Sequence, residues 1–229
     1  MELPEAERAA LQKELAHQAR RARIELDPER LAKLSQFVDL LLFWRRRMAL
    51  VGSRTWQDVV RKHCADSFHA AHLVDEARRV ADLGTGAGFP GLVLAIVCPG
   101  SPFVLVESRA KPVSFLRYCI REIGIENVEV VRARAEDFAA APEQRGRYDL
   151  VFSRGVWPLD EFLSVSESLL SEGGKAIAMK GPRVREEAVG LLRAPFDLVF
   201  EEYSLEAGER RVLVVATLRR SRGAVRCFT

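Results

Sequence analysis

The sequence of 229 residues predicts an α/β protein in which a mostly parallel, Rossmann-like sheet follows an N-terminal helical extension. Short β-rich segments alternate with helical segments from Arg79 onward, as in parallel strands joined by right-handed crossovers. The residues EAGE at 206–209 join the last two β-rich segments, which predicts a terminal antiparallel hairpin. A glycine-rich turn, GTGAGFPG at 84–91, directly follows the first β-rich segment.

The N-terminal part of the chain has a helical pattern. Apolar residues recur at three- and four-residue steps over 31–42. Asp27 and Pro28 predict the start of this helix, because Asp caps helices and Pro fits a first turn. Thr55 or Asp66 is expected to cap the short helices that follow.

Seven β-rich segments define the expected sheet, with helices between most of them. The expected strands are 80–83, 103–107, 128–133, 148–153, 174–180, 196–205 and 210–218. The expected helices lie near 90–97, 111–123, 136–141 and 159–171. We therefore divide the chain into a helical region at 1–78, a sheet-containing domain at 79–218 and a basic tail at 219–229.

The charge of the chain is unevenly distributed. The formal net charge is only +3, but residues 210–229 hold six arginines and no acidic residue. Further arginine clusters lie at 20–23 and 45–47. Each cluster alone is typical of a solvated surface, whereas the three together favour a polyanionic partner.

Other features of the composition suggest the compartment. The N-terminal residues lack the apolar core of a signal peptide, and the apolar stretch at 37–44 is too short to span a bilayer. The cysteines are widely separated and form no CxxC pair, which is typical of reduced thiols. We expect a cytoplasmic protein, a monomer, with no membrane contact and no metal site.

The glycine-rich turn departs from the dinucleotide-binding pattern G-x-G-x-x-G, because Gly88 comes one residue early after Gly84 and Gly86. The carboxylate of Asp82 would also repel a pyrophosphate. S-adenosylmethionine suits this turn, since it carries a sulfonium and an ammonium but no phosphate. We expect the three glycines and Phe89 to bind it, with Asp82 contacting its amino group or fixing the loop. A tight turn without a ligand is the alternative.

Acidic residues at the ends of the next two strands are candidates for the nucleoside of this cofactor. Glu107 lies where a carboxylate can accept hydrogen bonds from both ribose hydroxyls. Ala135 and Glu136, after the third strand, are placed to meet the adenine, as is Asp137. Each acidic residue could instead only cap the helix that follows it.

Basic residues follow the fourth and fifth strands. SRGVWPL at 153–159 stands where amino-directed methyltransferases carry an Asn/Asp-Pro-Pro-aromatic motif. Arg154 and Lys180 can only donate hydrogen bonds, so they suit acceptors such as guanine O6. Guanine N7 already carries an in-plane lone pair, so its methylation needs placement rather than a catalytic base. Ordinary strand-end charges are the alternative interpretation.

Five segments of the chain resemble one known family. They are RKHCADS (61–67), DLGTGAGFPG (82–91), SRGV (153–156), MKGP (179–182) and GERR (208–211). They are similar to the bacterial 16S ribosomal RNA guanine-N7 methyltransferase G, also called glucose-inhibited division protein B. The resemblance covers roughly residues 28–218 in the same order and spacing.

The resemblance implies the sheet of class I S-adenosylmethionine-dependent methyltransferases and formation of 7-methylguanosine at guanine 527, in the 530 loop of 16S rRNA. Its partner would be 16S rRNA or the small ribosomal subunit. Arg154, Lys180 and Arg134 would face the substrate, with Arg154 also bordering the cofactor. The segment 63–67, with His63, Asp66 and Ser67, would link the helical region to the cofactor site.

Two other classes of function remain open at this point. The chain could methylate another RNA, a small molecule or a protein, although the arginine clusters favour a polyanion. It could also be a non-catalytic nucleotide-binding assembly factor, for which a substituted glycine loop would be expected. The loop at 84–91 is intact.

Overall fold

The computed structural model describes residues 3–48, 50–74, 78–155, 157–189, 195–206 and 208–219. The predicted basic tail lies outside the described residues apart from Arg219, and so does Val156 of the SRGV segment.

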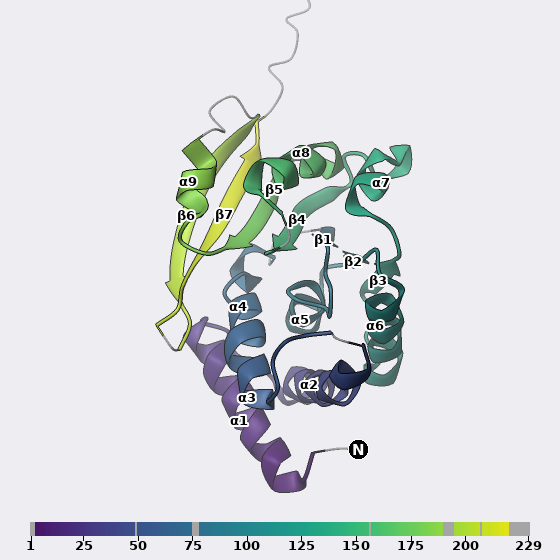
Figure 1. The fold of residues 1–229 in the computed structure, drawn as a ribbon, viewed down its shortest axis with the longest axis vertical. Helices are drawn as coiled ribbons and strands as arrows, with labels where there is room; N and C mark the ends of the chain where they lie inside the picture. The colour runs from purple at the N-terminus through teal and green to yellow at the C-terminus, as the bar shows by residue number, and fades with distance from the viewer. Residues whose placement is uncertain are drawn as a thin grey trace, which may run out of the picture.

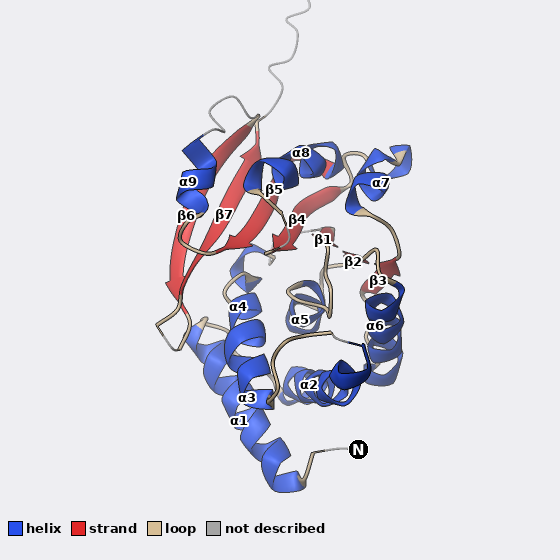
Figure 2. Ribbon diagram, in the orientation of Figure 1, coloured by secondary structure: helices blue, strands red, loops and turns tan. Residues whose placement is uncertain are grey.

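Within this part of the chain, seven strands form one sheet in the order β3-β2-β1-β4-β5-β7-β6, drawn in red in Figure 2. The strands are β1 (Val80–Leu83), β2 (Phe103–Val106), β3 (Val128–Val131), β4 (Tyr148–Arg154), β5 (Leu170–Lys180), β6 (Phe196–Ser204) and β7 (Arg210–Leu218). Strands β1 to β5 are parallel, and β7 pairs antiparallel with both β5 and β6. The predicted fold class, with its terminal hairpin, is confirmed.

The register places the basic residues at one edge of the sheet. Arg154, the last residue of β4, pairs with Met179 of β5, and Lys180 follows directly. Because the carboxyl ends of parallel strands meet at the same edge, both side chains lie beside the loop that follows β1.

Helices cover both faces of the sheet (Figure 1). One face carries α1 (Glu5–Arg21), α2 (Pro28–Met48), α4 (Ala65–Phe68), α5 (Gly91–Val97) and α6 (Ala110–Ile123). The other carries α7 (Ala135–Ala140), α8 (Leu159–Leu169) and α9 (Val184–Ala188). None of the helices that the structure describes combines the length and low polarity that a membrane span requires.

The N-terminal helices share a hydrophobic core with the sheet. Leu11 of α1 and Phe37 of α2 are fully buried in the same cluster as Leu92 of α5 and Leu105 of β2. The path from α2 to the sheet runs through α3 (Trp56–Asp58), a π-helical segment η1 (Val59–Cys64), α4 and a 3-10 turn η2 (Ala71–Leu73). A further 3-10 turn, η3 (Pro142–Gln144), precedes β4.

Two of the predicted caps are present. Asp27 Oδ1 accepts a hydrogen bond from the Arg30 amide at 2.7 Å, and Thr55 Oγ1 accepts one from the Asp58 amide at 3.2 Å. Asp66 lies inside α4, where its carboxylate binds side chains instead of capping.

The largest differences from the sequence-based expectation concern three elements, β5, α8 and α9. Strand β5 begins at Leu170 rather than at 174, and α8 accordingly ends at Leu169. The polar, glycine-containing residues 171–174 carry no strand signal, but Leu170 pairs with Tyr148 across a bulge and extends the strand. The short helix α9 was not expected, because its five residues are mostly charged.

Candidate functional site

The loop between β1 and α5 packs its backbone tightly against its surroundings. Gly88 has φ +101°, and a Cβ there would lie 2.9 Å from Leu92 Cβ. A Cβ on Gly91 would lie 2.3 Å from Leu105 Cδ2. Neither position can hold a larger residue unless the loop or the side chains packed against it shift.

Asp82 of β1 holds the glycine loop in place through a hydrogen bond. Its side chain is fully buried, and Oδ2 accepts a hydrogen bond from the Gly91 amide at 2.8 Å. Burial raises the pKa of Asp82 to about 6, although the Gly91 amide offsets part of this effect. Of the two expected roles, the structure shows the loop-fixing contact, and Asp82 borders neither of the cavities described below.

Glu107, which directly follows β2, also holds the glycine loop in place through a hydrogen bond. Its Oε2 accepts a hydrogen bond from the Gly86 amide at 3.1 Å, and Oε1 accepts one from the Arg109 amide at 2.8 Å. The guanidinium of Arg109 reaches both oxygens, at 3.1 and 3.3 Å. Burial opposes ionisation, but the hydrogen bonds from Arg109 and Gly86 outweigh it and lower the pKa of Glu107.

Two cavities flank the loop, and Gly84 lines both. The first, of about 260 Å³, we call the β3-side cavity; the second, of about 440 Å³, the β5-side cavity. The β3-side cavity is lined by Glu107, Arg109, Arg134, Ala135, Glu136 and Trp157, among others. The β5-side cavity is lined by His63, Gly86, Phe89, Arg154, Lys180 and Arg211, among others.

This arrangement brings most of the predicted site residues together. Glu107, Ala135 and Glu136 meet in the β3-side cavity, and within the described part of the chain no side chain makes a capping hydrogen bond at the start of α7. Arg154 and Lys180 meet in the β5-side cavity. The structure separates others: Arg134 lines the β3-side cavity instead, and Gly88, which packs against Leu92 and Leu116, lines neither cavity.

Arg154 is held on three sides. Its Nε forms an ion pair with Asp66 Oδ2 at 2.9 Å, and its Nη2 donates to His63 Nδ1 at 2.5 Å. The guanidinium carbon lies 5.6 Å from the centre of the Phe89 ring. The segment 63–67 thus reaches the glycine loop and the end of β4.

His63 is a neutral acceptor in this arrangement. An arginine can only donate, so Nδ1 of His63 carries no proton. The proton therefore belongs to Nε2, which lies 3.0 Å from Ser53 Oγ. Burial, with the nearby charge of Arg154, lowers the pKa of His63 to about 4.

Lys180 is tied to the other side of the cavity. Its ammonium forms an ion pair with Glu187 Oε2 of α9 at 2.9 Å and donates to the Trp157 carbonyl oxygen. Glu187 Oε2 also accepts the Leu159 amide at 2.9 Å. Residue 180 is therefore fixed by α9 and by the start of α8.

Comparison with known proteins identifies the family. Residues 30–214 match the family model described as rRNA small subunit methyltransferase G. The chain is 37% identical over 202 residues to the Ribosomal RNA small subunit methyltransferase G of Desulfitobacterium hafniense, covering 85% of this chain and 84% of that protein. It is 39% identical over 210 residues to the protein of that name from Rubrobacter xylanophilus, covering 86% and 79%. The chain belongs to the rRNA small subunit methyltransferase G family.

Solved structures share the fold of this family member. A putative O-methyltransferase from Klebsiella pneumoniae matches with a TM-score of 0.62 and 16% identity, over 87% of this chain and 94% of that one. TYW2 of M. jannaschii, solved in complex with AdoMet, matches with a TM-score of 0.54 and 19% identity, over 68% and 75%.

These findings confirm three predictions. The resemblance to the methyltransferase G family is confirmed by the family model and the relatives. The methyltransferase sheet with N-terminal helices is confirmed by the architecture. S-adenosylmethionine as the cofactor is confirmed by the family to which the chain belongs.

Several residues at the site of this methyltransferase G family member were not found from its sequence, among them Arg109 and Tyr203. Arg109 donates to Glu107, and only its position two residues further along the chain could have indicated it. Tyr203 donates its hydroxyl to Asp66 Oδ1 at 2.5 Å from 137 residues away. No local pattern in the sequence indicates such a contact.

Proposed function

We propose that this protein transfers the methyl group of S-adenosylmethionine to N7 of a guanine in small-subunit ribosomal RNA, namely guanine 527 in the 530 loop of 16S rRNA. The names of the relatives support a small-subunit rRNA substrate. The choice of guanine N7 is supported by the chemistry of the β5-side cavity and by the family resemblance.

The residues around the glycine loop fit the cofactor. The Glu107 carboxylate is held ionised and oriented at the β3-side cavity, where ribose hydroxyls would replace the Arg109 guanidinium as donors to its oxygens. A Cβ on Gly86 would meet nothing closer than 3.9 Å, so there is open space beside the loop. The adenosine would occupy the β3-side cavity, with Ala135 and Glu136 at the adenine. When bound, the cofactor supplies an electrophilic methyl group on its sulfonium.

Arg154 and Lys180 would place the guanine. Two N–H groups of Arg154 are used by Asp66 and His63; among the residues that the structure describes no other hydrogen-bond partner is found for it, so its remaining donors could meet an acceptor such as guanine O6. Lys180 lines the same cavity and can meet a second acceptor. In-line transfer then requires chiefly that N7 be held behind the methyl group.

The protonation state of His63 is the observation that most supports guanine N7 as the methylated atom. Both ring nitrogens of this histidine are engaged, and its pKa of about 4 makes it a poor proton acceptor at neutral pH. A nucleophile that must lose a proton before attack would need a base, whereas N7 has a free lone pair. A site with two donors and an occupied histidine therefore suits N7.

The same chemistry sets requirements on the RNA substrate. N7 of a paired guanine is hard to reach in the deep groove of A-form RNA, so the target should be an accessible loop base. Binding would weaken as salt rises, because phosphate contacts release counterions. We further propose a cytoplasmic monomer in which residues 79–218 hold the cofactor and 1–78 form the helical region.

The test is transfer of labelled methyl groups to small ribosomal subunits that lack the modification, followed by mapping of the labelled base. We expect stoichiometric 7-methylguanosine at position 527, and no label on large subunits. Label at another base or on another atom would refute the assignment. Label on proteins or small molecules alone would favour the alternative substrates.

A further inference from the structure

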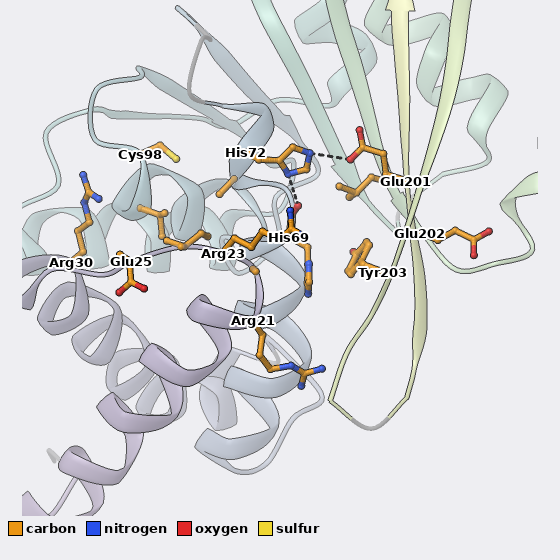
Figure 3. Close-up of a pocket in the computed structure, with 15 residues that line it drawn as sticks. Arg21, Arg23, Glu25, Arg30, His69, His72, Cys98, Glu201, Glu202 and Tyr203 are labelled. Atoms are coloured by element: carbon orange, nitrogen blue, oxygen red, sulfur yellow. Dashed lines mark hydrogen bonds and ion pairs between the residues drawn. The ribbon is translucent and has the colours of Figure 1, made fainter.

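Tyr203 contacts two separate regions of the molecule, one through its ring and the other through its hydroxyl. Its ring on β6 packs against His69, with ring centres 4.4 Å apart and 31° between the ring planes, and the two lie side by side in Figure 3. Both rings border a cavity of about 690 Å³ between the α1–α2 connection, η2 and β6. The hydroxyl, however, reaches Asp66 Oδ1 at 2.5 Å, and Asp66 lines the β5-side cavity.

Asp66 is buried, with 2% of its surface exposed, so its oxygens need donors. Oδ1 accepts the Tyr203 hydroxyl, and the Arg211 guanidinium is more distant, at 3.8 Å. Oδ2 pairs with Arg154 Nε at 2.9 Å. The carboxylate therefore cannot rotate without weakening its contact with Tyr203 or with Arg154.

The Arg154 guanidinium is planar, so two anchors fix its plane. Asp66 is one anchor and His63 Nδ1 is the other. We propose that Tyr203 is a positioning residue for methyl transfer: by holding the Asp66 carboxylate, it sets the orientation in which Arg154 meets the substrate. This inference rests on the proposed function, because it assigns Arg154 to the guanine.

The role of the Tyr203 hydroxyl can be tested independently of the packing of its ring. A Tyr203→Phe change keeps the volume and the packing against His69, and removes only the donor to Asp66. The Arg154 plane then loses part of its restraint, and small misplacements of a positioning group cost rate rather than binding. The cofactor contacts of Glu107 do not involve Tyr203 and should be preserved.

Tyr148→Phe is a matched control. Tyr148 is fully buried and donates its hydroxyl to Gln144 Oε1 at 2.6 Å, but it packs on the opposite face of the sheet. Both changes thus remove one hydroxyl that donates to a side-chain oxygen, from a fully buried ring at Tyr148 and a partly buried ring at Tyr203. Only one of these hydroxyls reaches the Arg154 anchor.

The experiment measures single-turnover methyl transfer to unmodified small subunits at saturating S-adenosylmethionine. We expect Tyr203→Phe to slow transfer roughly 10- to 30-fold, and Tyr148→Phe to change it less than about 2-fold. The Kd for S-adenosylhomocysteine should stay within about 2-fold in both. Equal rates in the two variants would overturn the inference, whereas a wild-type protein that methylates no small subunit would refute the proposed function.

Two further measurements separate positioning from a general structural effect. In an Arg154→Lys background, Tyr203→Phe should have no additional effect on rate, because the group it positions has been replaced. An undiminished effect there would overturn the inference. Independently of activity, the ¹⁵N signal of the Arg154 Nε–H should shift in Tyr203→Phe and persist unchanged in Tyr148→Phe; an unshifted signal would also overturn it.

Discussion

Arg154 at the end of β4 donates a hydrogen bond to Nδ1 of His63, at 2.5 Å. This contact fixes the tautomer of the histidine and directs its Nε2–H toward Ser53. The two residues are 91 positions apart in the sequence. Their contact determines which groups at the β5-side cavity can donate hydrogen bonds and which can accept them.

His63 should make the protein less stable in mild acid. Its pKa is about 4 in the folded state and 6.5 as an ordinary histidine, so between these values the unfolded chain binds a proton that the native protein does not. The contribution of His63 to the free energy of unfolding is fully present above pH 6.5 and declines as the pH falls toward 4. Urea unfolding at pH 7 and pH 5 measures the decline.

His63→Asn serves as the reference for this measurement, since an amide oxygen can accept from Arg154 but does not titrate. Asp82, with a pKa near 6, titrates in the same range in both proteins and cancels in the comparison. The wild type should lose more stability than His63→Asn on acidification. Parallel losses would contradict the assignment of His63 as neutral.

Arg154→Ala and Lys180→Ala should reduce turnover far more than cofactor affinity. We expect a loss of about 100-fold or more in kcat/KM, because donors to the substrate are removed. Arg154→Ala should also lower the free energy of unfolding, by about 3 kcal/mol, since it leaves the buried Asp66 without its nearer charge partner and only Arg211 at 3.8 Å. Calorimetry with S-adenosylhomocysteine and methylation rates provide the two readouts; turnover that persists unchanged would remove these residues from the substrate site.

Glu107→Ala should weaken cofactor binding by about 100-fold, since it removes the acceptor for the ribose and releases the Gly86 amide. S-adenosylhomocysteine should raise the Tm of the wild type but not of this variant, and NAD should raise neither. Glu129→Ala, on the exposed side of β3, is the control and should bind normally. Stabilisation by NAD alone would contradict the cofactor assignment.

Gly88→Ala should cost clearly more stability than Gly124→Ala. Both glycines have positive φ, +101° and +71°, so either change strains the backbone by about 1 kcal/mol or more. Only at Gly88 would the new Cβ meet Leu92 and Leu116, at 2.9 and 3.0 Å, which adds about 1–3 kcal/mol of overpacking. Chemical unfolding of both variants compares them, and equal losses would show that the loop relaxes around the methyl group.

The fold was predictable because its determinants are local. Alternating β-rich and helical segments specify parallel strands, and EAGE specifies the final hairpin. Parallel strands bring their carboxyl ends to one edge, so the residues that follow β1, β2, β4 and β5 could be assigned to a common site before the structure was known.

The grouping within the site depends on strand order, which the sequence does not show. Arg134 and Arg154 both lie at strand ends, but β3 and β4 are separated by β2 and β1. That separation explains why Arg134 borders a different cavity from Arg154. The contact between Tyr203 and Asp66 depends equally on how β6 packs against α4, and no periodicity encodes it.

Gly84 forms part of the wall of both cavities, and this shared wall matters for inhibitor design. With no side chain at that position, a ligand can run from Glu107 to Arg154 past bare backbone. A bisubstrate compound that joins an adenosine to a purine by a short tether would engage both cavities at once, and a larger residue at 84, where φ is +72°, would strain the backbone and obstruct the cofactor as well as such a compound.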